Sequence, residues 1–167
     1  MKWLLILLLS ISALAQDPVD VAKSYIGESE NLGPNRSINI DRWNRFANAP
    51  VGSYWCASFV SAMYHQGGYV APVTAWSPAF FTNPKNLVKL ADIRRNDAIG
   101  FYFPKKGRIA HIGLIERLQG AYIVTVEGNT SDDAGIVRDG GGVYRKFRPV
   151  KLMDNRNRYS RFQPKAE

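Results

Sequence analysis

The first helices of the fold are predicted by the spacing of apolar residues. Asp17 followed by Pro18 is typical of an N-cap and a first helical position, and apolar residues then recur at helical spacing. This helix is expected to end at Gly27 or Gly33, because glycine favours helix termination. A second, shorter helix is expected over 40–49, where aromatic residues share one side.

A third helix is predicted over 54–66. Ser53 is a suitable N-cap, and Gly67 follows the last helical residue, as is common at helix C-termini. Cys56 then lies in the first turn, on the same helix face as Val60. We therefore expect its thiol to face the body of the protein and not bulk solvent.

The pattern changes from helical to extended after Asn96. The segment 69–89 has no clear period, and we interpret it as a long connection with one helical turn. Beyond it, β-branched and aromatic runs separated by turn residues predict strands over 98–103, 109–118, 121–126 and 143–147. Helices followed by strands predict an α+β fold, with N-terminal helices packed on a C-terminal antiparallel β-sheet.

The N-terminal segment has the features of a secretory signal peptide. Lys2 precedes an apolar run over 3–9 and a small-x-small cleavage pattern at 13–15. The apolar run is too short to span a bilayer, and no later segment is longer. We predict removal of residues 1–15 and a periplasmic or secreted protein, with 16–167 as one domain and no membrane-spanning segment.

The chain carries a formal net charge of +8, which favours polyanionic surroundings. Nucleic acid, anionic lipid and anionic cell-envelope polymers all meet that condition. Export favours the envelope. The sequence also has no zinc-finger spacing, phosphate-binding glycine loop or aromatic-basic RNA motif, so nucleic acid is not expected as a partner.

Cys56 is the only cysteine of the chain, so no internal disulfide can form. This residue alone leaves two interpretations open. A free thiol is commonly a small buried hydrophobic group. A lone thiol exported into an oxidising compartment also suits a nucleophile.

The two histidines differ in their surroundings. His65 lies near the end of the third helix, where a solvent-exposed or capping role is expected. His111 lies in the middle of an apolar strand, where an imidazole needs a hydrogen-bond partner to offset its loss of hydration. His111 is therefore the candidate base.

The next strand offers a partner for His111. Glu127 and Asn129 are two residues apart and project from one sheet face if the strand continues. A three-residue hairpin loop at 118–120 sets His111 directly opposite Glu127. A two-residue loop turns Glu127 to the other face, so the prediction depends on the register.

Together these residues predict nucleophilic catalysis. A helix N-terminus and a neighbouring imidazolium both favour the thiolate form of Cys56. His111 accepts the thiol proton and later protonates the leaving amine. Glu127 or Asn129 orients the imidazole, and the backbone N–H of Cys56 donates to the oxyanion.

The blocks WCASFV at 55–60, AHIG at 110–113 and EGN at 127–129 resemble the signature blocks of the CHAP amidase/peptidase domain, within the NlpC/P60-like, papain-related group. The resemblance spans most of the chain after the signal peptide. It implies a papain-like fold and hydrolysis of amide bonds in peptidoglycan stem peptides or cross-bridges. The catalytic residues that it implies are Cys56, His111, Glu127 and Asn129.

The chain departs from its relatives at two places. Some of them carry acidic calcium ligands before the cysteine block, but 50–55 has none, so we expect neither a bound metal nor a cofactor. Many have a Gly-Asp pair where this chain has Asn and Asp at 96–97, which we expect to alter only a turn. The acidic pair at 132–133 is interpreted as a solvated loop.

The walls of a substrate cleft are expected close to the cysteine and in the connection that follows its helix. For Trp76 a role in covering the core remains open as well. The candidate substrate-binding residues are Tyr54, Trp55, Trp76 and Ser77.

Three functions are consistent with these observations. The leading one is a peptidoglycan hydrolase, with peptidoglycan as partner, anionic envelope polymers near its basic surface and a monomeric state. The second is an antibacterial toxin or effector with the same chemistry. The third is a wall-binding module without turnover, against which the intact Cys56 and His111 argue.

Overall fold

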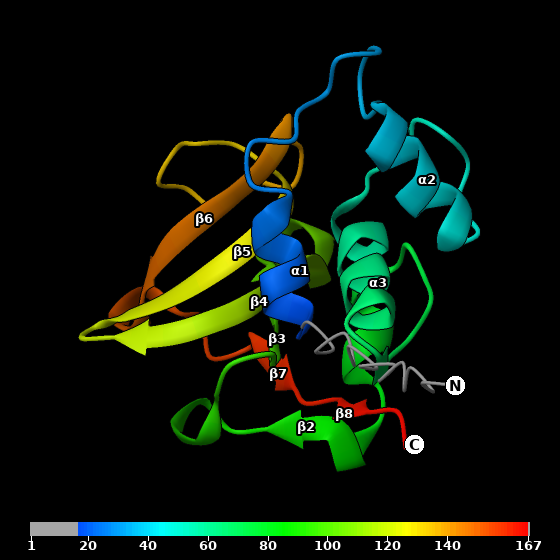
Figure 1. Cartoon of the computed structure of the whole chain (residues 1–167). Helices are drawn as coiled ribbons and strands as arrows, with labels where there is room; N and C mark the ends of the chain where they lie inside the picture. The colour runs from blue at the N-terminus through cyan, green and yellow to red at the C-terminus, as the bar shows by residue number, and fades with distance from the viewer. Residues whose placement is uncertain (1–16, 167) are drawn as a thin grey trace, which may run out of the picture.

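The computed structural model describes residues 17–166, and the predicted signal peptide lies outside them. Within this range the helices come first and a six-stranded antiparallel sheet follows (Figure 1), which confirms the predicted α+β class. The α-helices are α1 (Pro18–Ser24), α2 (Ile38–Phe46) and α3 (Cys56–Gln66).

The first two helices begin where side chains can accept hydrogen bonds from their free N–H groups. Asp17 caps α1 as predicted, by accepting from the backbone N–H of Asp20. Helix α2 begins earlier than predicted, because Ser37 acts as its N-cap and accepts from the N–H of Ile40 at 3.1 Å. The sequence prediction overlooked this serine.

Helix α3 begins at Cys56, which corrects the expected start at Tyr54. Trp55 occupies the N-cap position without making a side-chain capping bond, so the prediction of Ser53 as the cap is wrong. The first N–H groups of a helix have no intrahelical partner. Cys56 is the first residue of α3, so its N–H is one of these free groups. It lies at the positive end of the α3 dipole.

The large sheet has the strand order β2-β7-β3-β4-β5-β6. Its strands are β2 (Leu87–Val88), β3 (Ala98–Phe103), β4 (Arg108–Gln119), β5 (Tyr122–Thr130), β6 (Gly142–Pro149) and β7 (Arg158–Ser160). A separate antiparallel pair joins β1 (Tyr69–Val70) to β8 (Gln163–Pro164). The prediction missed β1, β2, β7 and β8, because strands of two or three residues are too short to show alternation.

The connection between α3 and β3 holds more structure than the single turn expected. This connection contains three short 3₁₀ helices, and two of the later loops contain one each. They are η1 (Ser77–Phe81), η2 (Pro84–Asn86), η3 (Leu90–Asp92), η4 (Pro104–Lys106) and η5 (Val150–Leu152).

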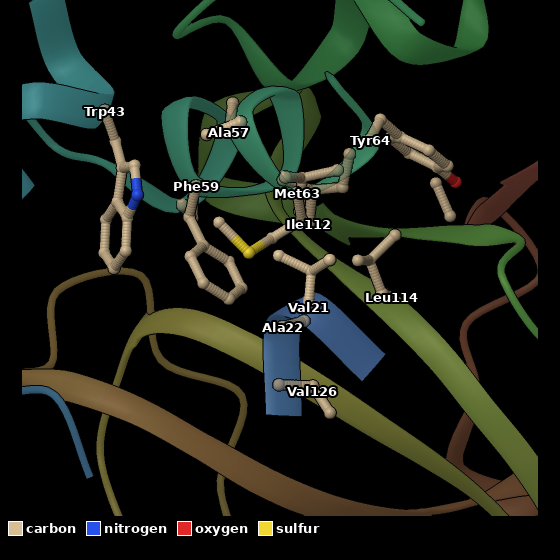
Figure 2. Packing of buried hydrophobic residues seen from close by; sticks show 14 of the residues in the cluster. Val21, Ala22, Trp43, Ala57, Phe59, Met63, Tyr64, Ile112, Leu114 and Val126 are labelled. Atoms are coloured by element: carbon tan, nitrogen blue, oxygen red, sulfur yellow. The ribbon is translucent and has the colours of Figure 1, made fainter. Parts of the chain in front are cut away.

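Helices α1 and α3 pack on one face of the sheet and form the main hydrophobic core with it (Figure 2). Phe59 and Met63 of α3 extend towards Ala22 of α1 and the sheet residues Ile112 and Val126, and all five are almost fully buried. A second cluster lies on the opposite sheet face, formed by residues that alternate with the first set. Its members are Ile93, Ile99, Phe101, Ile115, Ile123 and Tyr159.

The basic C-terminal stretch 156–161 is part of the fold. Strand β7 within it lies between β2 and β3. Arg161 donates to both carboxylate oxygens of the buried Asp97, at 2.8 Å each. Among the described residues, no helix has the length and apolar character needed to cross a membrane.

The contact between α1 and α3 depends on the missing side chain of Gly67. A Cβ atom there would lie 2.6 Å from the backbone nitrogen of Pro18. Gly67→Ala should therefore lower the free energy of unfolding by about 1–3 kcal/mol, measured by urea denaturation. Gly141→Ala is the matched control, because its Cβ meets no atom within 4 Å. Equal stability of the two variants would contradict this account of the packing.

Candidate active site

Cys56 lies at the N-terminal end of α3, almost fully buried. Its Sγ atom is 3.7 Å from the hydroxyl of Ser77, the first residue of η1. The backbone N–H of Ala57 and the imidazole of His111 also interact with the thiol. The thiol is thus surrounded by groups that stabilise a negative charge on sulfur.

His111 projects from β4, paired in the ladder with Phe101. The two rings stack with centroids 5.6 Å apart, which fixes one face of the imidazole. Its Nε2 atom lies 2.9 Å from Oε2 of Glu127. Its Nδ1 atom is buried and has no hydrogen-bond partner among the described residues. The ring is therefore anchored through one nitrogen, and the other is available to the thiol of Cys56.

The hairpin between β4 and β5 differs from the predicted one. Gln119 pairs with Tyr122, so the loop has two residues and not the three expected. A register shift between Ile115 and Arg117 leaves Glu116 as an extra residue in β4. The short loop and this bulge compensate for each other, and so Glu127 still projects from the same face as His111.

Glu127 is a diagonal neighbour of His111, and the predicted position directly opposite is wrong. The ladder pairs Leu114 with Val126, so the same register sets Gly113 across from Glu127. A Cβ atom at Gly113 would lie only 2.5 Å from Cγ of Glu127. The glutamate thus crosses the space that glycine leaves empty and reaches the imidazole.

Glu127 is fully buried and every side of its carboxylate is occupied. Arg148 of β6 donates to both carboxylate oxygens, at 2.9 and 2.6 Å. The hydroxyl of Thr125 donates to Oε1 at 2.5 Å. The sequence prediction missed Arg148, and the pattern of β6 gives no signal for it, because the alternate positions 144 and 146 hold Tyr and Lys. This arginine offsets the cost of burying the carboxylate and fixes its orientation.

Asn129 makes its hydrogen bonds to groups other than His111. Its φ of 54° breaks the regular strand, and a register shift follows Glu127 in the pairing of β5 with β6. The Asn129 side chain accepts from the N–H of Gly140 at 3.3 Å and donates to Asn35 at 3.4 Å. Within the described residues the group bonded to the imidazole is thus Glu127, and Asn129 connects two loops.

Burial and the ion pairs oppose each other in setting the pKa values of the site. Burial raises the pKa of the Cys56 thiol, but the neighbouring His111 imidazole, with Ser77 and the N–H of Ala57, outweighs it and lowers this pKa below its ordinary value. Burial lowers the pKa of His111, yet Cys56 and Glu127 together raise it to about 9. Burial likewise raises the pKa of Glu127, while His111 and Arg148 bring it far below its ordinary value. The directions of these shifts favour a thiolate–imidazolium pair over a neutral thiol and imidazole.

A cleft of about 410 Å³ opens beside the thiol. Three of the four predicted wall residues, Tyr54, Trp76 and Ser77, line it together with Cys56. Trp55 does not line it, which corrects the fourth prediction. Its indole is fully buried, donates to Glu30 at 3.1 Å and packs within the main core. A tryptophan beside the nucleophile is here a core residue.

Two arginines that the sequence prediction missed also line the cleft. Arg108 begins β4, and Arg138 belongs to the loop between β5 and β6. The guanidinium of Arg138 lies over the Tyr54 ring, 3.8 Å from its centroid. The sequence does not reveal that they line the cleft, because both lie far from Cys56 in sequence and reach it only in the folded chain.

His65 lies apart from this site. It is exposed at the end of α3 and packs beside Phe46, with ring centroids 4.9 Å apart, as its sequence context predicted. In residues 17–166 no group of three or more His, Cys, Asp or Glu side chains is arranged to hold a metal ion.

Comparisons of the sequence with protein-family models and with curated proteins gave no match. The likeness to the CHAP domain therefore rests on the three sequence blocks alone, and any function must be argued from the geometry of the site.

Removing the charge of Glu127 should narrow the pH range of the thiolate–imidazolium pair. In Glu127→Gln the imidazolium loses its carboxylate, so the pKa of His111 should fall from about 9. The weaker imidazolium then stabilises the thiolate less, and the pKa of Cys56 should rise. The rate of alkylation of Cys56 by iodoacetamide is measured from pH 4 to 10. We expect the midpoint of this pH profile to shift by about one pH unit or more in the variant.

Asp92→Asn serves as the control, because it removes an exposed carboxylate on η3, outside the site. An unchanged alkylation profile in Glu127→Gln would remove Glu127 from this role.

Proposed function

We propose that the protein is a cysteine amidase or peptidase that hydrolyses amide bonds of peptidoglycan. The observation that carries the proposal is the order of three groups that begins with Cys56 at the cleft wall and continues inward to the buried His111 and Glu127. Cys56 interacts with an imidazole whose other nitrogen is bonded to a buried carboxylate. This order of thiol, base and orienting group is the one that nucleophilic catalysis needs.

The chemistry follows from that order. The Cys56 thiolate attacks the amide carbonyl, and the new oxyanion is stabilised by the N–H of Cys56 and the hydroxyl of Ser77. The His111 imidazolium then protonates the leaving amine, which gives a thioester on Cys56. His111, now neutral, takes a proton from water, and the resulting hydroxide attacks the thioester to release the acid and restore the thiolate.

Peptidoglycan is the substrate that the sequence supports best. The three sequence blocks resemble those of CHAP domains. Because that resemblance implies a papain-like fold, we propose this fold for the protein as well. The predicted signal peptide leads to the periplasm or the exterior, and the net charge of +8 suits an anionic envelope. The cleft is open at the surface, as an extended peptide requires.

Digestion of purified peptidoglycan, followed by mass spectrometry of the new termini, tests the proposal. New amino termini within the stem or cross-bridge indicate an endopeptidase. Release of whole stem peptides from the glycan indicates an amidase. Intact peptidoglycan after treatment with thiol-reduced, folded protein would refute the proposed substrate.

Cys56→Ser should reduce hydrolysis by about a thousandfold or more while the fold is kept, because an alcohol is far less acidic than a thiol. Circular dichroism checks the fold, and turbidity loss of a peptidoglycan suspension measures hydrolysis. His65→Ala is the matched control, since this histidine lies outside the cleft. A loss in His65→Ala as large as in His111→Ala would mean that the wrong histidine was chosen as the base.

Hydrolysis should persist in the presence of EDTA, because each proposed step uses only side chains and water. The same assay with EDTA, with added calcium and with neither measures this. Loss of activity in EDTA that calcium restores would show that a metal is needed.

A further inference from the structure

The charged side chains that line the cleft beside Cys56 are all positive among the described residues. Arg108 and Arg138 line it, and none of the described residues that line it is Asp or Glu. Apart from Cys56 itself, the remaining lining residues are apolar or carry uncharged polar groups, Tyr54 and Ser77 among them. An anionic ligand is therefore attracted to this cleft, and a cationic one is repelled.

Neither of these arginines forms an ion pair with a carboxylate within the described residues, whereas many other arginines do. Many guanidinium groups of the described chain pair with carboxylates, namely those of Arg36, Arg95, Arg117, Arg145, Arg148, Arg156 and Arg161. Arg108 makes one bond, to the carbonyl of Ile109 at 2.9 Å. Arg138 makes no side-chain hydrogen bond within residues 17–166 and rests on the ring of Tyr54. Most of their donors remain available to a ligand.

Both arginines are also held in place. Arg108 lies on β4, three residues before His111, on the strand that carries the base. The loop that carries Arg138 is tied to β6, because Arg148 donates to the carbonyls of Ala134 and Gly135 at 3.1 and 2.8 Å. Lys146 donates to two further carbonyls of the same loop. A loop fixed in this way keeps its guanidinium over the cleft.

We propose that Arg108 and Arg138 bind a free carboxylate next to the scissile amide, so that the cleft selects peptides with that carboxylate over their amidated forms. This specificity rests on the proposed amide hydrolysis at Cys56. Guanidinium groups present paired donors that match the two oxygens of a carboxylate. A neutral carboxamide offers one acceptor oxygen and no charge, so it binds less strongly.

The charge preference can be measured without any peptide substrate. Iodoacetate and iodoacetamide alkylate the same thiolate, and they differ in the carboxylate that one of them carries. The ratio of their rates cancels the thiolate fraction, so changes in the pKa of Cys56 do not affect it. The ratio is the iodoacetate rate divided by the iodoacetamide rate, normalised to the same ratio for N-acetylcysteine. At low salt this ratio should be about five- to tenfold higher for the wild-type protein than for the double variant Arg108→Gln/Arg138→Gln. This difference should shrink in 0.5 M NaCl.

Lys89→Gln/Lys151→Gln removes the same charge from exposed positions that do not line the cleft. This control should keep the wild-type ratio. A ratio that stays the same in the arginine variant, or that falls equally in the lysine variant, overturns the proposal. The His111 imidazolium is common to all these proteins, so its own attraction for iodoacetate does not alter the comparison.

Paired peptidoglycan fragments, one with free carboxylates and one amidated at the same positions, test the substrate itself. We expect the free form to have a KM about tenfold lower, and this preference should be lost in the arginine double variant with little change in kcat. Equal cleavage of both forms by the wild type would overturn the carboxylate preference and leave the hydrolase intact. Cleavage of neither form, with the alkylation preference present, would refute the hydrolase and keep the anion-binding cleft.

Discussion

The buried carboxylate of Glu127 is the constraint on which the candidate site depends. A fully buried charge is costly unless it is paired and hydrogen-bonded, and this one is bonded to His111, Arg148 and Thr125. Arg148 neutralises the carboxylate in the absence of substrate, so the imidazole of His111 does not have to be charged for the fold to be stable. The base can therefore gain and lose a proton during a reaction while the buried charges remain balanced.

Arg148 also connects this charge balance to the shape of the cleft. Its guanidinium bonds Glu127 with two nitrogens and uses Nη1 for the loop carbonyls of Ala134 and Gly135. The loop thus fixed carries Arg138 to the cleft wall. One residue thereby positions the group that orients the base and the loop that we propose binds substrate, so a change at Arg148 should affect both together.

Local patterns in the sequence were sufficient for the α+β class, the first helix and the central strands. The site was predicted as far as its chemistry is local, because an apolar strand makes His111 conspicuous and a helix start makes Cys56 conspicuous. The register was not predicted, since a bulge at Glu116 leaves no mark in the hydrophobic pattern. The core role of Trp55 and the cleft role of Arg138 were missed for a similar reason. Both depend on contacts between segments distant in sequence.

Two irregularities of β4 explain how a regular sheet can hold this site. The register shift after Phe101 leaves Ala110 unpaired, so that Ala110 lines the cleft while the adjacent His111 meets Glu127. The second bulge, at Glu116, returns Glu127 to the face of His111 after a hairpin loop that would otherwise turn it away. Between the two bulges lies Gly113, whose missing side chain gives the glutamate its path. Because each feature corrects the geometry left by another, changing any one of them should misalign the thiol, base and carboxylate even though the six-stranded sheet still forms.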